Sequence, residues 1–226
     1  MSELRAWLAA AGAVCAKDLR AEFRTRYALS AIGLFAITTL TVISFALGPF
    51  GLEQDLLAAL LWVVLFFAAM AGLARVFVRE EEAGTAPALR LAAPPGAVYL
   101  GKYLFNLALL LMLEVLIVPL FVVMMGLQVG SLGLFALVLL LGNLGLAGAT
   151  TIIAAMVSQA SARGALFTVL SFPLLLPLLI SAIEGTRSTL AQSAAAGIWP
   201  SLQVLGAYAV AMVTVSLMLF PLVWTE

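Results

Sequence analysis

Few residues of this chain are suited to covalent or metal chemistry. Its 226 residues include no histidine and a single cysteine, Cys15. Histidine is the commonest metal ligand and proton shuttle, and it is the base of Ser/His and Cys/His catalytic pairs. The two aspartates, Asp18 and Asp55, fall at positions expected to face water. We therefore expect no catalytic residue and no metal site, and a membrane enzyme is the least favoured functional class.

The stretch Gly96–Tyr103 nearly matches a nucleotide-binding motif. Its sequence, GAVYLGKY, has the glycines and lysine of a phosphate-binding P-loop but lacks the final Ser or Thr. A P-loop needs a preceding strand and a hydroxyl for magnesium, whereas this stretch follows Pro94-Pro95 and runs into an apolar segment. We interpret the match as a coincidence, and we expect the chain to bind no nucleotide or other cofactor of its own.

Charged residues of the chain interior are concentrated in the segment Arg75–Lys102. Its 28 residues hold four basic residues, three consecutive glutamates and three prolines, between two very apolar runs. Such a composition cannot lie in hydrocarbon. We predict that this segment lies in water between two membrane spans and that any outside partner contacts the chain there.

The elements that position this segment are membrane helices. The chain is 65% hydrophobic and 10% charged, whereas charged residues make up about a quarter of a soluble domain. This predicts an all-α membrane protein with one transmembrane domain over residues 1–226. Six segments have the length and apolarity of spanning helices: Tyr27–Leu47, Leu56–Val78, Tyr103–Met125, Leu132–Val157, Leu166–Ile183 and Leu202–Trp224.

The distribution of basic residues predicts the orientation. With six spans both termini lie on one side, and if that side is the cytoplasm, ten basic residues lie inside and only Arg187 lies outside. This asymmetry follows the positive-inside rule. We expect a multi-pass inner-membrane protein with both termini in the cytoplasm, and no nucleic acid partner.

Residues 1–26 have the pattern of an amphipathic helix. At helical spacing one stripe is apolar, with Lys17, Arg20 and Arg24 opposite, which favours a helix on the membrane surface. Asp18 and Glu22 interrupt the edge of the stripe, and Glu22 has Arg26 as an i+4 partner. A secretory signal peptide is the alternative, but the basic residues follow the apolar run instead of preceding it. The stripe consists of Leu4, Trp7, Leu8, Ala11, Val14, Cys15 and Leu19.

Within the charged segment, residues 79–98 are predicted to form a hairpin with a short helix. Gly84 ends the preceding run, Thr85 can cap a new helix, and Pro87 lies in its first turn. Pro94-Pro95 stops this helix after about two turns. The hairpin is either a solvated connector or a docking helix for a cytoplasmic partner, and we favour docking. The candidate contact residues are Arg79, Glu80, Glu81, Glu82, Gly84, Thr85, Leu89 and Arg90.

Polar and helix-distorting residues also occur inside the spans. Glu114 lies near the middle of the third span, where a carboxylate must face protein or water. It is either a buried helix contact or part of a translocation path. The fifth span holds Pro173 and Pro177, which predict a kink or a break at mid-membrane.

The fourth span carries Gly142, Gly145 and Gly148, which predict close helix packing, with the lining of a pathway as the alternative. Beyond the fifth span, Glu184–Ser201 predicts a short outer helix capped at Ser188 and ended by Gly197. Trp199 and Trp224 are expected at the two membrane surfaces.

The arrangement resembles the permease subunit of a type-2 ABC exporter, and most closely the haem exporter protein B (CcmB) family of cytochrome c maturation. The resemblance covers essentially the whole chain. The triple glutamate and the alanine-rich outer stretch depart from the family pattern. The segments that carry the resemblance are Lys17–Arg20, Glu22–Arg24, Phe77–Thr85, Leu91–Pro94, Leu140–Gly145 and Ser171–Ile180.

The resemblance implies a permease homodimer with two copies of a separate ATPase, CcmA, working with the haem-handling proteins CcmC and CcmD and the chaperone CcmE. Haem iron requires an axial His, Met, Cys or Tyr, and the absence of histidine favours a subunit that transmits ATPase movement while another subunit ligates haem. A type-2 permease for a lipid-linked or drug-like substrate would share the same features. A secondary transporter is less favoured, because Glu114 is the one acid available at the midplane.

Overall fold

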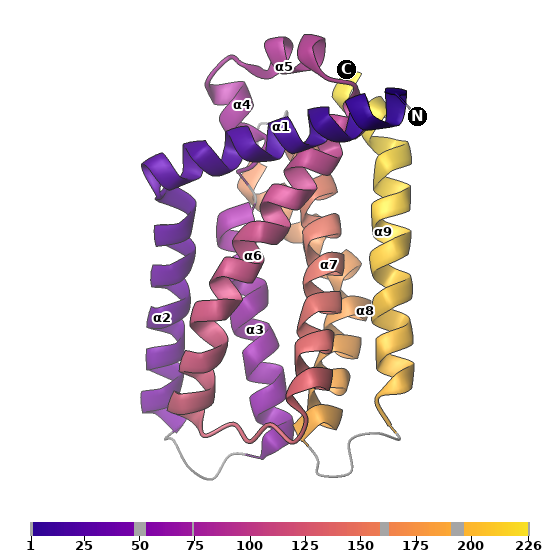
Figure 1. The fold of residues 1–226 in the computed structure, drawn as a ribbon. Helices are drawn as coiled ribbons and strands as arrows, with labels where there is room; N and C mark the ends of the chain where they lie inside the picture. Colours follow the sequence, from indigo (N-terminus) through magenta and orange to yellow (C-terminus); the bar gives the residue numbers. More distant parts are fainter. Residues whose placement is uncertain (1, 48–52, 74, 159–162, 191–196, 226) are drawn as a thin grey trace.

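The computed structural model describes residues 2–47, 53–73, 75–158, 163–190 and 197–225, and these form helices α1 to α9 with no strand. Six long helices run side by side as a bundle, and α1 lies across one end of it (Figure 1). We call this end, formed by α1, α4, α5, the start of α6 and the end of α9, the basic end. The helices are α1 Ser2–Thr25, α2 Tyr27–Leu47, α3 Gln54–Leu73, α4 Val78–Glu82, α5 Ala86–Ala92, α6 Pro95–Met125, α7 Leu132–Val157, α8 Arg163–Leu190 and α9 Trp199–Thr225.

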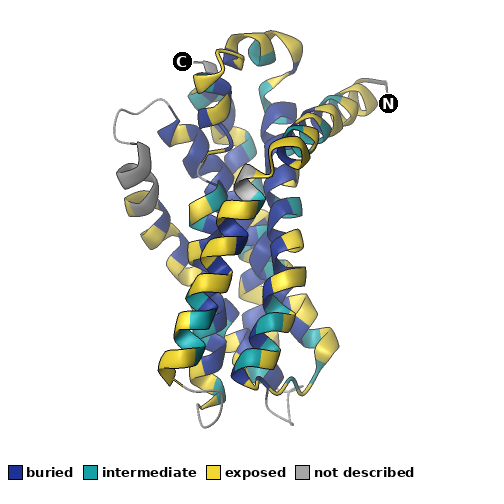
Figure 2. Ribbon diagram, turned by 90° about the vertical axis from the view of Figure 1, so that its left-hand side faces the viewer, coloured by how far each residue is buried: buried dark blue, intermediate teal, exposed yellow. Residues whose placement is uncertain are grey.

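The prediction of an all-α membrane protein is confirmed. In the described part of the chain, six helices are long and apolar enough to cross a membrane. Their outward faces carry large apolar side chains, such as Phe45 and Val123, which are 86% and 80% exposed. Figure 2 shows the exposed residues on the outer faces of the helices and the buried ones turned inward. An apolar outer surface is what hydrocarbon chains require.

Helix α6 starts eight residues earlier than the predicted third span, at Pro95 instead of Tyr103. Pro94 is in the extended region, and Pro95 occupies the first helical position, where its missing N–H costs nothing. The 31 residues of α6 span about 46 Å at 1.5 Å per residue, against roughly 30 Å of hydrocarbon. The helix therefore extends past the bundle, and its first turns support α1 (Figure 1).

The glycines of α7 lie where other helices approach closely. A Cβ at Gly142 would overlap the Trp62 ring of α3, and one at Gly145 would lie 2.7 Å from Leu178 Cδ1 of α8. Gly148 has ordinary clearance, since its nearest neighbour would be 3.5 Å away. Trp62 is fixed by a hydrogen bond from its Nε1 to Thr186 Oγ1 at 2.8 Å. This contact joins α3, α7 and α8.

Helix α8 has no break at its two prolines, where the predicted kink stays a prediction, and its far end differs from the predicted one. The helix continues through Pro173 and Pro177 without a break, and the Tyr208 hydroxyl of α9 donates to Leu174 O at 2.9 Å. It also runs on to Leu190, so the predicted cap at Ser188 is wrong. Ser188 lies inside α8 and donates to Glu184 O at 3.0 Å. The rest of the predicted outer helix falls on residues 191–196, which lie outside the described residues.

Candidate functional site: the hairpin and its charge cluster

The hairpin turns at Gly84, between α4 and α5. Gly84 has φ +64°, the left-handed conformation that glycine adopts without strain. The Thr85 N–H donates to Glu80 O at 2.9 Å and the Gly84 N–H donates to Glu81 O at 3.2 Å. This pair of bonds is the Schellman pattern that ends a helix. The predicted break at Gly84 is therefore present, and its backbone groups are paired.

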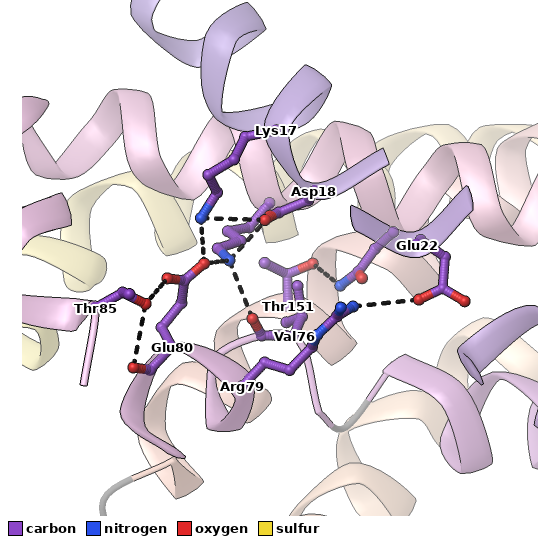
Figure 3. A network of polar contacts seen from close by, with 10 residues as sticks. Lys17, Asp18, Glu22, Val76, Arg79, Glu80, Thr85 and Thr151 are labelled. Atoms are coloured by element: carbon purple, nitrogen blue, oxygen red, sulfur yellow. Dashed lines mark hydrogen bonds and ion pairs between the residues drawn. The ribbon is translucent and has the colours of Figure 1, made fainter. Parts of the chain in front are cut away.

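Glu80 is the centre of a buried ionic network beneath this turn. It is 6% exposed, and its Oε1 accepts hydrogen bonds from Lys17 Nζ of α1 and from Lys102 Nζ of α6, the latter at 2.8 Å. Thr85 Oγ1 donates to Glu80 Oε2 at 2.5 Å. Thr85 thus occupies the N-cap position of α5, but its side chain bonds to Glu80 instead of capping the helix. Figure 3 shows Lys17, Asp18, Glu80 and Thr85 converging.

Lys102 is the most deeply buried member of this network, at 1% exposed. Its Nζ lies 2.9 Å from Asp18 Oδ2 and donates to Val76 O at 3.1 Å. The prediction that the whole segment Arg75–Lys102 is in water is wrong for Glu80 and Lys102. Opposite charges pair here inside the protein, because an unpaired buried charge would be too costly.

Lys17 completes the network from α1. Its Nζ contacts Glu80 Oε1 and lies 3.3 Å from Asp18 Oδ1. Burial lowers the pKa of Lys17, but the hydrogen bond to Glu80 and the charge of Asp18 outweigh burial and raise that pKa above its ordinary value. Lys17 is therefore fully protonated at neutral pH. Burial, and then Asp18, raise the pKa of the neighbouring Cys15 thiol, which makes it a poor nucleophile.

A second ion pair joins the hairpin to the corner between α1 and α2. Glu22 is 1% exposed, and its Oε2 lies 3.2 Å from Arg79 Nη1 of α4. Its Oε1 accepts a hydrogen bond from the Leu29 N–H at 3.1 Å. The predicted pair of Glu22 with Arg26 is not formed, because Arg26 has φ +53° and turns the chain out of the helix. We call Lys17, Asp18, Glu22, Arg79, Glu80 and Lys102 the charge cluster.

The two acids that interrupted the apolar stripe of α1 are thus on its buried face. Ala11, Val14, Asp18 and Glu22 are buried at spacings of three and four, whereas Leu4 is 63% exposed. The fit against α6 is close, since a Cβ at Gly101 would lie 2.6 Å from Val14 Cβ. Part of the face predicted to contact lipid therefore packs on α6 and the hairpin.

An aromatic group holds the other side of the hairpin to the end of α9. The Arg90 guanidinium lies 5.1 Å from the Trp224 ring centroid, and Trp224 stacks on Phe220 with centroids 5.4 Å apart. Phe77, which precedes α4, packs against both rings. Trp224 is buried at the end of the sixth candidate span, so its ring packs on protein, and its place at a membrane surface stays a prediction. Trp199 is exposed at the far end of α9.

The outer face of α5 carries exposed apolar side chains. Leu91 is 92% exposed, and Ala88 and Ala92, which share its side of the helix, are exposed with it. Leu89, the residue singled out from the sequence, is half-buried and packs against the core. The sequence could have identified Leu91 as the exposed leucine, because residues two apart in a helix lie on different faces and Leu89 is on the packed one.

The remaining candidate contact residues lie at the edge of this surface. Glu82 is exposed and its Oε2 lies 3.1 Å from Arg75 Nη2. Glu81 is half-buried, with its Oε1 4.0 Å from Arg90 Nη2. Gly84 is exposed at the turn. The hairpin therefore has a buried half, which holds Glu80, and an exposed half, which a partner can contact.

Glu114 lies inside the bundle, on α6 and 12 residues after Lys102 of the charge cluster. It is 8% exposed, and Asn143 of α7 faces its carboxyl group. Glu114 Oε1 and Asn143 Nδ2 have no hydrogen-bond partner among the described residues. Glu114 thus faces the interior of the bundle, and its role as a helix contact or as part of a translocation path stays a prediction.

The comparison with known protein families identifies the chain. The family described as "CcmB protein" matches residues 9–222 of the 226. No curated protein matches the chain. The matched region takes in most of α1, the hairpin, five of the long helices entirely and α9 up to residue 222. The chain therefore belongs to the CcmB family, the permease subunits of ABC transporters that serve haem export in cytochrome c maturation.

Proposed function

We propose that this permease receives the movement of a separate ATPase subunit, CcmA, at the hairpin and passes it to the spanning helices. The observation that supports this most is the exposed apolar face of α5 around Leu91, which is 92% exposed. An apolar surface on a short solvated helix is suited to burial by a partner. The exposed Glu82 and half-exposed Glu81 beside it would set the orientation of that partner.

The charge cluster supports transmission, because it connects the hairpin to two other elements. Glu80 contacts Lys17 of α1 and Lys102 of α6, and Arg79 contacts Glu22 at the α1–α2 corner. Buried paired charges resist separation more than surface pairs do. A push on α5 would then move α1 and α6 with the hairpin instead of folding the hairpin over.

This proposal revises the set of residues assigned to ATPase contact. Glu81, Glu82, Gly84, Arg90 and the newly identified Leu91 remain on the accessible half of the hairpin. Glu80 and Leu89 support that half from its buried side, and the exposed Arg79 and Thr85 are bonded to Glu22 and Glu80.

The rest of the assembly follows from the family. We propose a homodimer of this permease in the inner membrane, with the basic end and both termini in the cytoplasm. ATP hydrolysis takes place on CcmA, and haem is ligated by other members of the complex, CcmC with CcmD, before it reaches the chaperone CcmE. Consistent with this arrangement, the chain has no histidine to offer as an axial ligand.

Co-purification of CcmA with the tagged permease tests the docking surface. Leu91→Asp puts a charge into the contact and is expected to abolish or strongly reduce recovery of CcmA at an unchanged membrane level of the permease. Leu4→Asp, at an exposed leucine of the same end but outside the hairpin, is the matched control and should retain CcmA.

A second variant tests the acidic edge of the surface. Glu81→Lys with Glu82→Lys should weaken recovery, because their present partners are surface arginines and the variant reverses the charge offered to CcmA. Glu80 is left unchanged, since a lysine there would add a third cation to Lys17 and Lys102. Full recovery of CcmA with both the Leu91 variant and this one would show that the hairpin is only a solvated connector.

A further inference from the structure

A cavity of about 380 Å³ opens at the basic end, between α1, α2, α3 and α6. Its inner wall is apolar and includes Ala31 of α2, Ala71 of α3 and Phe105 of α6. Arg75, Arg79 and Glu22 lie at its polar side. The volume is within the range of about 300 to 1,000 Å³ typical of small-molecule sites.

A second cavity, of about 350 Å³, adjoins the first and shares Thr25 and Arg79 with it. It adds Arg20 and Arg24 of α1. Arg79 is paired with Glu22, whereas Arg20 and Arg24 are exposed and have no ion pair in the part of the chain that the structure describes. The joint mouth of the two cavities therefore has an excess of positive charge beside an apolar interior.

We propose that these cavities together hold one anionic phospholipid of the adjacent leaflet, with its phosphate at Arg20, Arg24 and Arg79 and an acyl chain along Ala31 and Ala71. Guanidinium groups bind phosphate oxygens in pairs, and basic pockets between spanning helices at the membrane surface favour anionic headgroups.

The placement in the fold supports a lipid over a free anion. The arginines lie where the spanning helices end, at the depth of the headgroups, and the apolar wall belongs to exposed faces of α2 and α3 that look toward hydrocarbon. A free phosphate would use the arginines but leave the apolar wall uncovered. A phospholipid covers both surfaces.

Native mass spectrometry of the purified full chain tests the site, with phosphatidylglycerol and phosphatidylcholine of identical acyl chains as probes. We expect phosphatidylglycerol to be retained and phosphatidylcholine to be lost at the same activation energy. Arg20→Gln with Arg24→Gln should weaken phosphatidylglycerol binding about fivefold per arginine. Arg5→Gln with Arg187→Gln removes the same charge from distant positions and should have no effect.

A second pair of variants tests the acyl-chain part. Ala71→Phe on α3 and Ala31→Phe on α2 each place a larger side chain in the cavity while leaving the arginines in place. Each should lower phosphatidylglycerol retention in protein that still elutes as a single species. Equal retention of the two lipids, or equal losses in the distant control, would overturn the proposal. Displacement of the lipid by inorganic phosphate with no effect of either phenylalanine would also overturn it, in favour of a free-anion site.

Discussion

Glu80→Gln should loosen the hairpin without changing its shape, because glutamine has the size of glutamate but no charge. Glu80 is 6% exposed and contacts the ammonium groups of Lys17 and Lys102. With the carboxylate gone, two lysines share Asp18 alone, and Lys102 is 1% exposed. Removing one member of a buried ion pair costs about 3 to 5 kcal/mol. We expect about 3 kcal/mol, since Asp18 and Val76 O still hold Lys102.

Hydrogen–deuterium exchange measures this change locally. The N–H groups of Ala83, Gly84 and Thr85 are bonded to carbonyl oxygens of α4 and are exposed to exchange only when the turn opens. A loss of about 3 kcal/mol in the free energy of opening corresponds to exchange on the order of 100-fold faster at these amides. The amides in the middle of α7 should exchange at an unchanged rate.

Glu82→Gln is the matched control, because it makes the same substitution two residues away on the same short helix. Glu82 pairs with Arg75, and both side chains are about half exposed. An exposed pair contributes about 0 to 1 kcal/mol, so exchange should rise by less than about fivefold. If Glu80→Gln and Glu82→Gln accelerated exchange equally, the buried network would not be what holds the hairpin.

Three further predictions follow from the bundle and its orientation. Glu114→Lys should disrupt assembly while Glu114→Gln is tolerated, because the side chain is 8% exposed inside the bundle. Assembly is measured by size-exclusion chromatography, and normal assembly of the lysine variant would contradict the interior placement of Glu114. Gly142→Ala should destabilise the protein by about 1 to 3 kcal/mol, since its Cβ would overlap Trp62; Gly206→Ala, where nothing lies within 4 Å, is the control in a denaturation series. The orientation can be tested in a Cys15→Ser background with an impermeant thiol reagent added outside the cell. Gln128→Cys should react and Ala83→Cys should not, because Gln128 lies in the α6–α7 loop at the end opposite the hairpin. The reverse labelling pattern would show that the proposed orientation is inverted.

The sequence predicted the bundle well because hydrocarbon requires every spanning segment to be long and apolar. Apolar runs of sufficient length located the spanning helices, and Gly84 and Pro87 located the turn and the start of α5. Glu114 could be assigned to the interior from its charge alone. These inferences depend on local composition, which the sequence states directly.

The charge cluster could not be predicted, because it depends on contacts between segments far apart in the chain. Glu80 and Lys102 are 22 residues apart, and Lys17 and Glu80 are 63 residues apart. Within the segment Arg75–Lys102 the sequence alone does not distinguish a buried lysine from a solvated one. Asp18 and Glu22 were a signal that was available, since two acids on the apolar side of an amphipathic helix indicate a basic partner.

The order in which the ribosome makes α1 and α6 has a consequence for how α1 packs. Ala11 and Val14 are synthesised long before Gly101, the residue of α6 on which they pack. Lys17, Asp18 and Glu80 likewise exist before Lys102, which fills the space between the two acids. Until α6 emerges, the surface that covers Ala11 and Val14 does not exist, and the lipid surface is the other apolar environment open to an amphipathic helix. In the finished fold Ala11 and Val14 are covered by α6, whereas Leu4 and Leu8 stay exposed, so one part of the stripe serves protein packing and the other stays available to lipid.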